Sequence, residues 1–176
     1  MSGKRKLLFK CVIVGDGGVG KSTLVKRLMT GKYIEQKITI GTDLATYKIN
    51  YKNHSIVLQL WDFAGEKRFR FFLPNYARGA MGCLLCYDIA RRNTFKNLDE
   101  WYKIVTNNSD PVIALVGCKR DLADKKRSVT EKDAKELQDE KNIDIFYETS
   151  SKTGDNVKAL FEELTKKIVE INEIPL

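Results

Sequence analysis

One group of residues near the amino terminus has the types and spacing that can hold a chain of phosphates. It fits the pattern Gly, four residues, Gly-Lys-Ser, and lies between an apolar run and a segment with helical spacing, which is the setting this loop requires. Its glycines let backbone amides converge on phosphate oxygens, and the start of the helix adds positive potential. The residues are Gly15, Asp16, Gly17, Gly18, Val19, Gly20, Lys21 and Ser22.

Two side chains of this loop bring further chemistry. Lys21 supplies a point charge for the outer phosphates, and the Ser22 hydroxyl can coordinate magnesium. The same loop serves ATPases, kinases and GTPases, so it predicts a nucleoside phosphate site and leaves the base undecided.

Three later segments, residues 61–66, 117–122 and 148–152, each follow an expected strand. In the first, Asp62 could hold a magnesium water and Gly65 could offer its backbone amide to a terminal phosphate. In a parallel sheet, ligands bind at the carboxyl ends of the strands, so the three segments are expected to surround one site.

Asp121, in the second of these segments, indicates which base is bound. A carboxylate accepts two donors, and guanine offers N1-H and the exocyclic N2-H2 side by side, whereas adenine offers no such pair. Losing two hydrogen bonds to a charged group, at about 1.5 to 3 kcal/mol each, would disfavour adenine by at least about a hundredfold. We therefore expect a guanine nucleotide.

Hydrophobic periodicity predicts the elements that position these residues. Strand and helix patterns alternate after one antiparallel hairpin, which implies a mostly parallel sheet covered on both faces. Thr130 and Asp133 resemble a capping box at the start of a polar helix. Strands are expected at 7–15, 45–51, 56–60, 82–88, 111–117 and 143–147, and helices at 21–30, 94–106, 130–141 and 157–169.

Length and composition limit the class of protein. With 176 residues, 43% of them hydrophobic and 31% charged, the chain is expected to form a single globular domain spanning residues 1–176. It has no apolar run long enough to span a membrane, and no secretory signal is expected. Its four cysteines lack framework spacing, which favours a reducing, cytoplasmic setting.

At these motifs the chain resembles the Ras superfamily of small GTPases. Residues 39–43, 61–69 and 76–80 are most similar to its Rab branch, and the resemblance covers nearly the whole chain. It implies an α/β fold of the P-loop NTPase, small-GTPase type. That fold has a six-stranded, mostly parallel sheet with one antiparallel edge strand and about five flanking helices. It also implies a switch that binds GTP or GDP with Mg²⁺, hydrolyses GTP, and signals through switch regions at about 33–42 and 62–78.

The resemblance also assigns roles to residues. Ser22, Thr39 and Asp62 would bind magnesium, and Lys21, Gly65 and Glu66 would serve hydrolysis. The remaining residues would contact the nucleotide: Asp16, Gly17, Gly18, Val19, Gly20, Thr23, Tyr33, Cys118, Lys119, Asp121, Ser150, Ser151 and Lys152.

Several positions depart from the family's pattern. Cys118 replaces the usual asparagine, which predicts weaker binding and faster nucleotide release. Glu66 replaces the glutamine that positions the attacking water in this family, which predicts an altered and slow intrinsic hydrolysis. Phe63 and Leu44 also differ from the usual residues, and the first switch is one residue shorter than expected in Rab proteins, which bears on partner recognition.

Partners follow from the resemblance and from charge. We expect protein effectors, an exchange factor and a GTPase-activating protein, acting on a monomer. The net charge of +8 favours acidic partners, but no nucleic acid is expected. The chain ends without a prenylation cysteine, so membrane association is expected only indirectly or through a missing tail. Two alternatives stay open: a scaffold that binds GTP but hydrolyses it very poorly, and an adenine-nucleotide kinase.

Overall fold

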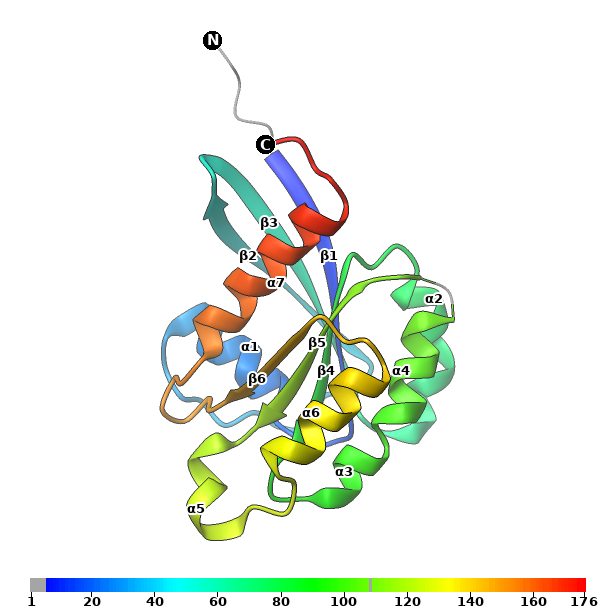
Figure 1. The fold of residues 1–176 in the computed structure, drawn as a ribbon, viewed down its shortest axis with the longest axis vertical. Coiled ribbons are helices and arrows are strands. Elements are labelled where there is room, and N and C mark those ends of the chain that lie inside the picture. The colour runs from blue at the N-terminus through cyan, green and yellow to red at the C-terminus, as the bar shows by residue number, and fades with distance from the viewer. Residues whose placement is uncertain (1–5, 108) are drawn as a thin grey trace.

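The computed structural model describes residues 6–107 and 109–176, and its centre is one six-stranded sheet (Figure 1). The strand order is β2-β3-β1-β4-β5-β6, in which only β2 runs antiparallel to its neighbour. This confirms the predicted sheet and its antiparallel edge strand. The strands are β1 (Lys6–Val14), β2 (Thr42–Tyr51), β3 (His54–Phe63), β4 (Gly82–Asp88), β5 (Val112–Cys118) and β6 (Ile145–Thr149).

The strand sequences explain this arrangement. Every residue of β4 and β5 is buried, as expected for central strands of a parallel sheet that is covered on both faces. The hairpin between β2 and β3 turns at Lys52 and Asn53, whose φ angles of 44° and 64° suit a tight two-residue turn.

Helices cover both faces of the sheet. One core cluster packs α1 and α7 against one face, and a second packs α2, α4 and α6 against the other. The helices are α1 (Lys21–Thr30), α2 (Leu73–Ala77), α3 (Arg92–Lys96), α4 (Leu98–Thr106), α5 (Ala123–Lys126), α6 (Glu131–Glu140) and α7 (Val157–Ile171). Two 3₁₀ turns, η1 (Lys67–Phe72) and η2 (Arg120–Leu122), precede α2 and α5. No helix in the described part of the chain is long and apolar enough to cross a membrane.

Most element boundaries differ from the sequence-based prediction by one to three residues, and two of the differences have an identifiable cause. The helix expected at 94–106 is divided into α3 and α4 at Asn97, whose side chain donates to the Asp16 carboxylate at 2.7 Å. The last strand begins at Ile145 instead of residue 143, because Ile143 exchanges hydrogen bonds with Gln138 at the end of α6. These are long-range or terminal contacts that periodicity does not encode.

The helix expected at 130–141 has the predicted start. The Thr130 hydroxyl accepts from the Asp133 backbone amide, and the Asp133 carboxylate accepts from the Thr130 backbone amide. This confirms the capping box.

Candidate functional site

The phosphate-binding loop joins β1 to α1 and is held by its own lysine. The Lys21 ammonium donates to the carbonyl oxygens of Gly15 at 2.7 Å and Asp16 at 2.9 Å. Only 6% of Lys21 is exposed, and burial lowers its pKa, an effect that nearby Asp62 opposes. Gly15 has a φ of 143°, and a Cβ there would lie 2.2 Å from the Cys86 carbonyl oxygen, so only glycine fits.

Gly65 brings the segment after β3 directly against this loop. A Cβ at Gly65 would lie 2.1 Å from the Gly17 backbone nitrogen, closer than any side chain allows. The absence of a side chain therefore lets the two backbones touch.

Three oxygens gather beside the loop. The Ser22 hydroxyl lies 2.6 Å from the Thr39 hydroxyl and donates to Asp62 Oδ2. Asp62 is 3% exposed, and its second oxygen, Oδ1, is buried without a hydrogen-bond partner. Burial raises the pKa of Asp62 to about 6, and the hydrogen bond from Ser22 and the charge of Lys21 limit the rise.

These oxygens fit a hard divalent cation. Mg²⁺ prefers oxygen ligands, commonly from one or two carboxylates together with substrate phosphates, and an unpartnered buried carboxylate oxygen is a suitable ligand. The described residues contain no group of three or more His, Cys, Asp or Glu side chains that could hold a metal ion. A cation at Ser22, Thr39 and Asp62 would therefore complete its shell with other oxygens, such as those of water and phosphates.

Two cavities of about 270 Å³ each adjoin the loop and share Gly20, Thr23, Tyr33 and Lys119 in their walls. The first also contains residues of the loop, Thr39, Gly65 and Glu66. The second is lined by Val19, Gly20, Thr23, Tyr33, Cys118, Lys119, Asp121, Leu122, Ser151 and Lys152. Residues expected to bind phosphate and base thus line two adjacent cavities with a common wall.

Asp121 is oriented within the second cavity by Ser150, whose hydroxyl donates to Asp121 Oδ1 at 2.7 Å. No described residue donates to its Oδ2 atom, so the carboxylate keeps acceptor capacity for a base. Tyr33, 45% exposed, lies on the wall that both cavities share.

Cys118 lies beneath the loop. It is buried, and its Cβ would be 3.9 Å from a Cβ on Gly20. Its thiol offers the loop a weaker hydrogen-bonding group than an asparagine amide would.

Glu66 lines the first cavity next to a positively charged side chain, Arg68, to which the sequence pattern assigns no role. Its carboxylate pairs with Arg68 at 2.7 Å, and both side chains are substantially exposed. Arg68 therefore offsets part of the negative charge that Glu66 would bring to a phosphate.

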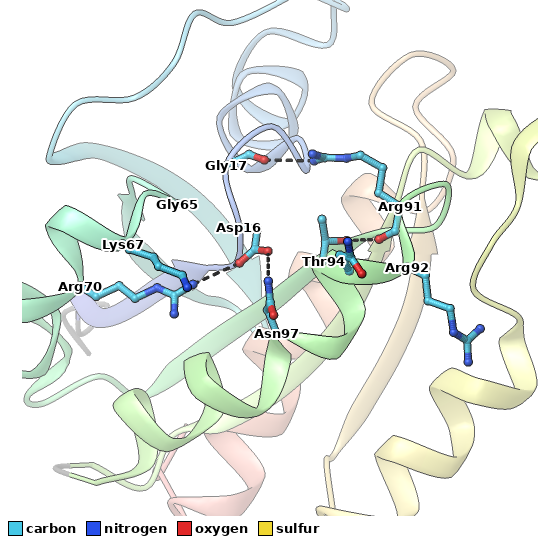
Figure 2. A pocket seen from close by; sticks show the side chains of 10 residues that line it. Asp16, Gly17, Gly65, Lys67, Arg70, Arg91, Arg92, Thr94 and Asn97 are labelled. Atoms are coloured by element: carbon cyan, nitrogen blue, oxygen red, sulfur yellow. Dashed lines mark hydrogen bonds and ion pairs between the residues drawn. The ribbon is translucent and has the colours of Figure 1, made fainter.

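The Asp16 side chain points to a third cavity, of about 560 Å³, between the loop, η1 and α3 (Figure 2). Its carboxylate accepts from Trp101 Nε1 at 2.8 Å and Asn97 Nδ2 at 2.7 Å, and lies 3.4 Å from Arg70. Asp16 is predicted to contact the nucleotide; its side chain is turned toward α4 and anchors the loop there. Proximity in sequence to Lys21 could not reveal this orientation.

Apolar side chains are exposed on both segments predicted as switches. Ile38 and Ile40 are 78% and 76% exposed, and Phe71 is 71% exposed. Leu44, which replaces an expected aromatic, is also exposed. Trp61 and Tyr76 pack together with their ring centroids 5.8 Å apart.

Comparison with known proteins places this geometry in a family. The sequence model of the Ras family matches residues 10–170. The chain is 41% identical over 167 residues to the Ras-related protein RABA1c of Arabidopsis thaliana, covering 93% of this chain and 76% of that protein. It is 40% identical to the Ras-related protein RABA6b of Arabidopsis thaliana, over 95% and 77%, and to the Ras-related protein Rab11B of Nicotiana tabacum, over 93% and 76%. The chain therefore belongs to the Ras family and is a Rab-like, GTP-binding small GTPase.

Proposed function

We propose that residues 1–176 form one nucleotide-binding domain that binds GTP and GDP with Mg²⁺, hydrolyses GTP, and signals the difference to effectors. The observation that supports this proposal is a pair of adjacent cavities with a common wall, one lined by Lys21, Ser22 and Thr39 and the other by Asp121. An outer phosphate group would bind near Lys21, and the guanine would bind near Asp121.

The chain's own residues divide the work of binding. Lys21 and the backbone amides of the loop would stabilise the negative charge of the phosphates. Asp62, Ser22 and Thr39 would hold Mg²⁺, which supplies positive charge to the phosphate oxygens when it is bound. Asp121, oriented by Ser150, would accept from guanine, while Lys119, Ser151 and Lys152 would line the base.

Switching follows from the position of Thr39 and Gly65. Both lie in segments outside regular helices or strands, and both reach the phosphate site through few contacts: Thr39 through Ser22, and Gly65 through Gly17. A terminal phosphate and its metal would order these segments, and hydrolysis would release them. The exposed side chains of Ile38, Ile40 and Phe71 would then present different surfaces to effectors in the two states.

Hydrolysis is the step on which this chain departs from its family. An ionised Glu66 can only accept hydrogen bonds and adds negative charge near the phosphates, whereas a glutamine can also donate. Its pairing with Arg68 reduces that charge but draws the carboxylate toward the surface. We propose a slow intrinsic rate, with a partner protein supplying further catalysis. Glu66 in place of glutamine also favours a second candidate function, a scaffold that holds GTP and hardly hydrolyses it.

Two measurements test these functions. The nucleotide released on denaturing freshly purified protein is expected to be GDP; mainly GTP would favour the scaffold, and an adenine nucleotide would contradict the role of Asp121. Single-turnover hydrolysis is expected to be faster in Glu66→Gln than in the wild type. Arg68→Ala is the matched control: if Glu66 repels the phosphates, removing its partner should slow hydrolysis further. Equal rates in all three proteins would show that Glu66 plays no part.

A further inference from the structure

Asp88, the last residue of β4, belongs to no motif. Its buried carboxylate pairs with the positively charged side chains of Arg91 and Lys119 at the edge of the site. Its side chain is 2% exposed. Oδ1 accepts from the Ala90 backbone amide at 2.8 Å, and Oδ2 accepts from Arg91 Nε at 3.0 Å and Lys119 Nζ at 2.7 Å. A buried carboxylate with donors of this kind is firmly held and can fix the positions of both cations.

The Arg91 and Lys119 side chains also contact the phosphate-binding loop. The second arm of the Arg91 guanidinium donates to the Gly17 carbonyl oxygen at 3.0 Å, and Lys119 donates to the Gly18 carbonyl oxygen at 2.9 Å. Figure 2 shows Arg91 extending from the end of its strand–helix connection to Gly17. Two consecutive carbonyl groups of the loop are thus tied to one carboxylate, and we call this arrangement of Asp88, Arg91 and Lys119 the Asp88 bridge.

The backbone around the bridge is built to hold it. Lys119 has a φ of 68°, a left-handed conformation that a lysine adopts at a cost and keeps only where its surroundings enforce it. The Asp88 backbone amide donates to the Thr94 hydroxyl at 2.9 Å, which in turn donates to the Arg91 carbonyl oxygen at 2.7 Å. The residues on both sides of Arg91 are therefore fixed relative to β4.

The bridge joins the two halves of the site. Lys119 belongs to the wall shared by the two cavities, and Gly17 is the loop residue against which Gly65 packs. Any opening of the loop at Gly17 or Gly18 must break a charge-assisted hydrogen bond. Cys118 offers the loop only a thiol, so the bridge is the stronger attachment between the loop and the end of β5.

We propose that Asp88 is a positioning residue that holds the phosphate-binding loop closed through Arg91 and Lys119, and that Arg91 thereby slows nucleotide release. This inference rests on the proposed function, because it assigns a step of the same site. Arg91 is the informative member of the bridge: its side chain is 47% exposed, so a variant should fold, and Asp88 retains Lys119 and Ala90 when Arg91 is removed.

Arg92 provides a matched control. It neighbours Arg91, lines the same 560 Å³ cavity and is also 47% exposed. Its guanidinium, however, binds the Asp133 carboxylate and the Ser128 carbonyl oxygen, and no contact to the loop is found for it among the described residues. A general effect of losing an arginine from this surface would appear in both variants.

The experiment measures release of a fluorescent GDP analogue from the full chain, chased with excess GDP, with Mg²⁺ and again in EDTA. Arg91→Ala is expected to release it about tenfold faster than the wild type, because the loss of half-exposed charge-assisted hydrogen bonds corresponds to about 1.4 kcal/mol. The ratio should persist in EDTA, since the bridge does not act through the metal. Arg91→Lys should recover only part of the wild-type lifetime, because an ammonium keeps the charge but lacks the second arm, and Arg92→Ala should stay within twofold of the wild type.

Thermal unfolding of the same proteins separates positioning from general stability. The proposal expects Arg91→Ala and Arg92→Ala to lower the unfolding midpoint by similar amounts while only the former speeds release. Release within twofold of wild type in Arg91→Ala, or equal acceleration in both alanine variants, would overturn it. A wild-type protein that fails to bind the GDP analogue would instead refute the proposed function, and the inference with it.

Discussion

Asp62 makes the metal-free protein sensitive to pH in a way that can be calculated. Burial raises its pKa from 3.8 to about 6 in the folded protein. Because the folded protein then binds this proton more tightly than the unfolded chain does, the free energy of unfolding falls as pH rises from about 4 to above 6. At 1.36 kcal/mol per pKa unit, the full loss is about 3 kcal/mol.

Only part of this loss in the free energy of unfolding falls in a pH range that is convenient to measure. At pH 5 the unfolded carboxyl is already ionised while the folded one is mostly protonated, so about half of the loss has already occurred. Between pH 5 and pH 7.5, Asp62 alone should lower the free energy of unfolding by about 1.4 kcal/mol. The residue is only 3% exposed, so little solvent screening reduces this figure.

Urea unfolding of nucleotide-free protein in EDTA measures this pH dependence. Asp62→Asn is the reference, because the contributions of all other titrating groups cancel in the difference between the two proteins. The wild type's free energy of unfolding, relative to the variant, should fall by about 1.4 kcal/mol between pH 5 and pH 7.5. Adding Mg²⁺ and GDP should reverse the sign, because metal binding requires the ionised carboxylate. A difference that stays constant with pH in EDTA would refute the reasoning.

Two further predictions concern the loop and its neighbours. Cys118→Asn should slow GDP release about tenfold, because an amide restores neutral hydrogen bonds of about 0.5 to 1.5 kcal/mol each. The control Cys83→Ser, on the opposite face of the sheet, should leave the rate unchanged. The fluorescent release assay measures both, and an unaltered rate in Cys118→Asn would contradict the role given to Cys118. Gly65→Ala should slow single-turnover GTP hydrolysis more than about tenfold and leave GDP affinity nearly unchanged. The reason is that its Cβ would force the segment after β3 away from Gly17. Unchanged hydrolysis would show that this contact is dispensable.

Local sequence patterns were sufficient for the sheet and for most of the elements. The turn residues Lys52 and Asn53 lie between two alternating runs, so the hairpin could be predicted from neighbours in the chain. The capping box of Thr130 was visible for the same reason. The break at Asn97 was not, because the partner of its side chain, Asp16, lies 81 residues away in sequence.

The candidate site also contains both residues that a short motif reveals and residues that only the fold brings together. Residues of the loop and Asp121 belong to short motifs and could be named from sequence, and they line two adjacent cavities. Asp88 belongs to no motif: its importance depends on the alignment of β4 with β5, which brings Asp88 opposite Cys118 and next to Lys119. Strand register decides such contacts, and sequence periodicity alone does not fix which residues of two strands become neighbours.

The two main departures from the family should affect different steps, because they lie in different cavities of the site. Cys118 ends β5 and lines the cavity that contains Asp121, whereas Glu66 follows β3 and lines the cavity that contains Thr39. They share no hydrogen-bond partner among the described residues, since Glu66 pairs with Arg68 at the surface and Cys118 is buried beneath the loop. Substitutions at sites without shared contacts act almost independently. A weaker hold on the nucleotide through Cys118 therefore does not imply slower hydrolysis, and the fraction of protein carrying GTP depends on both rates separately.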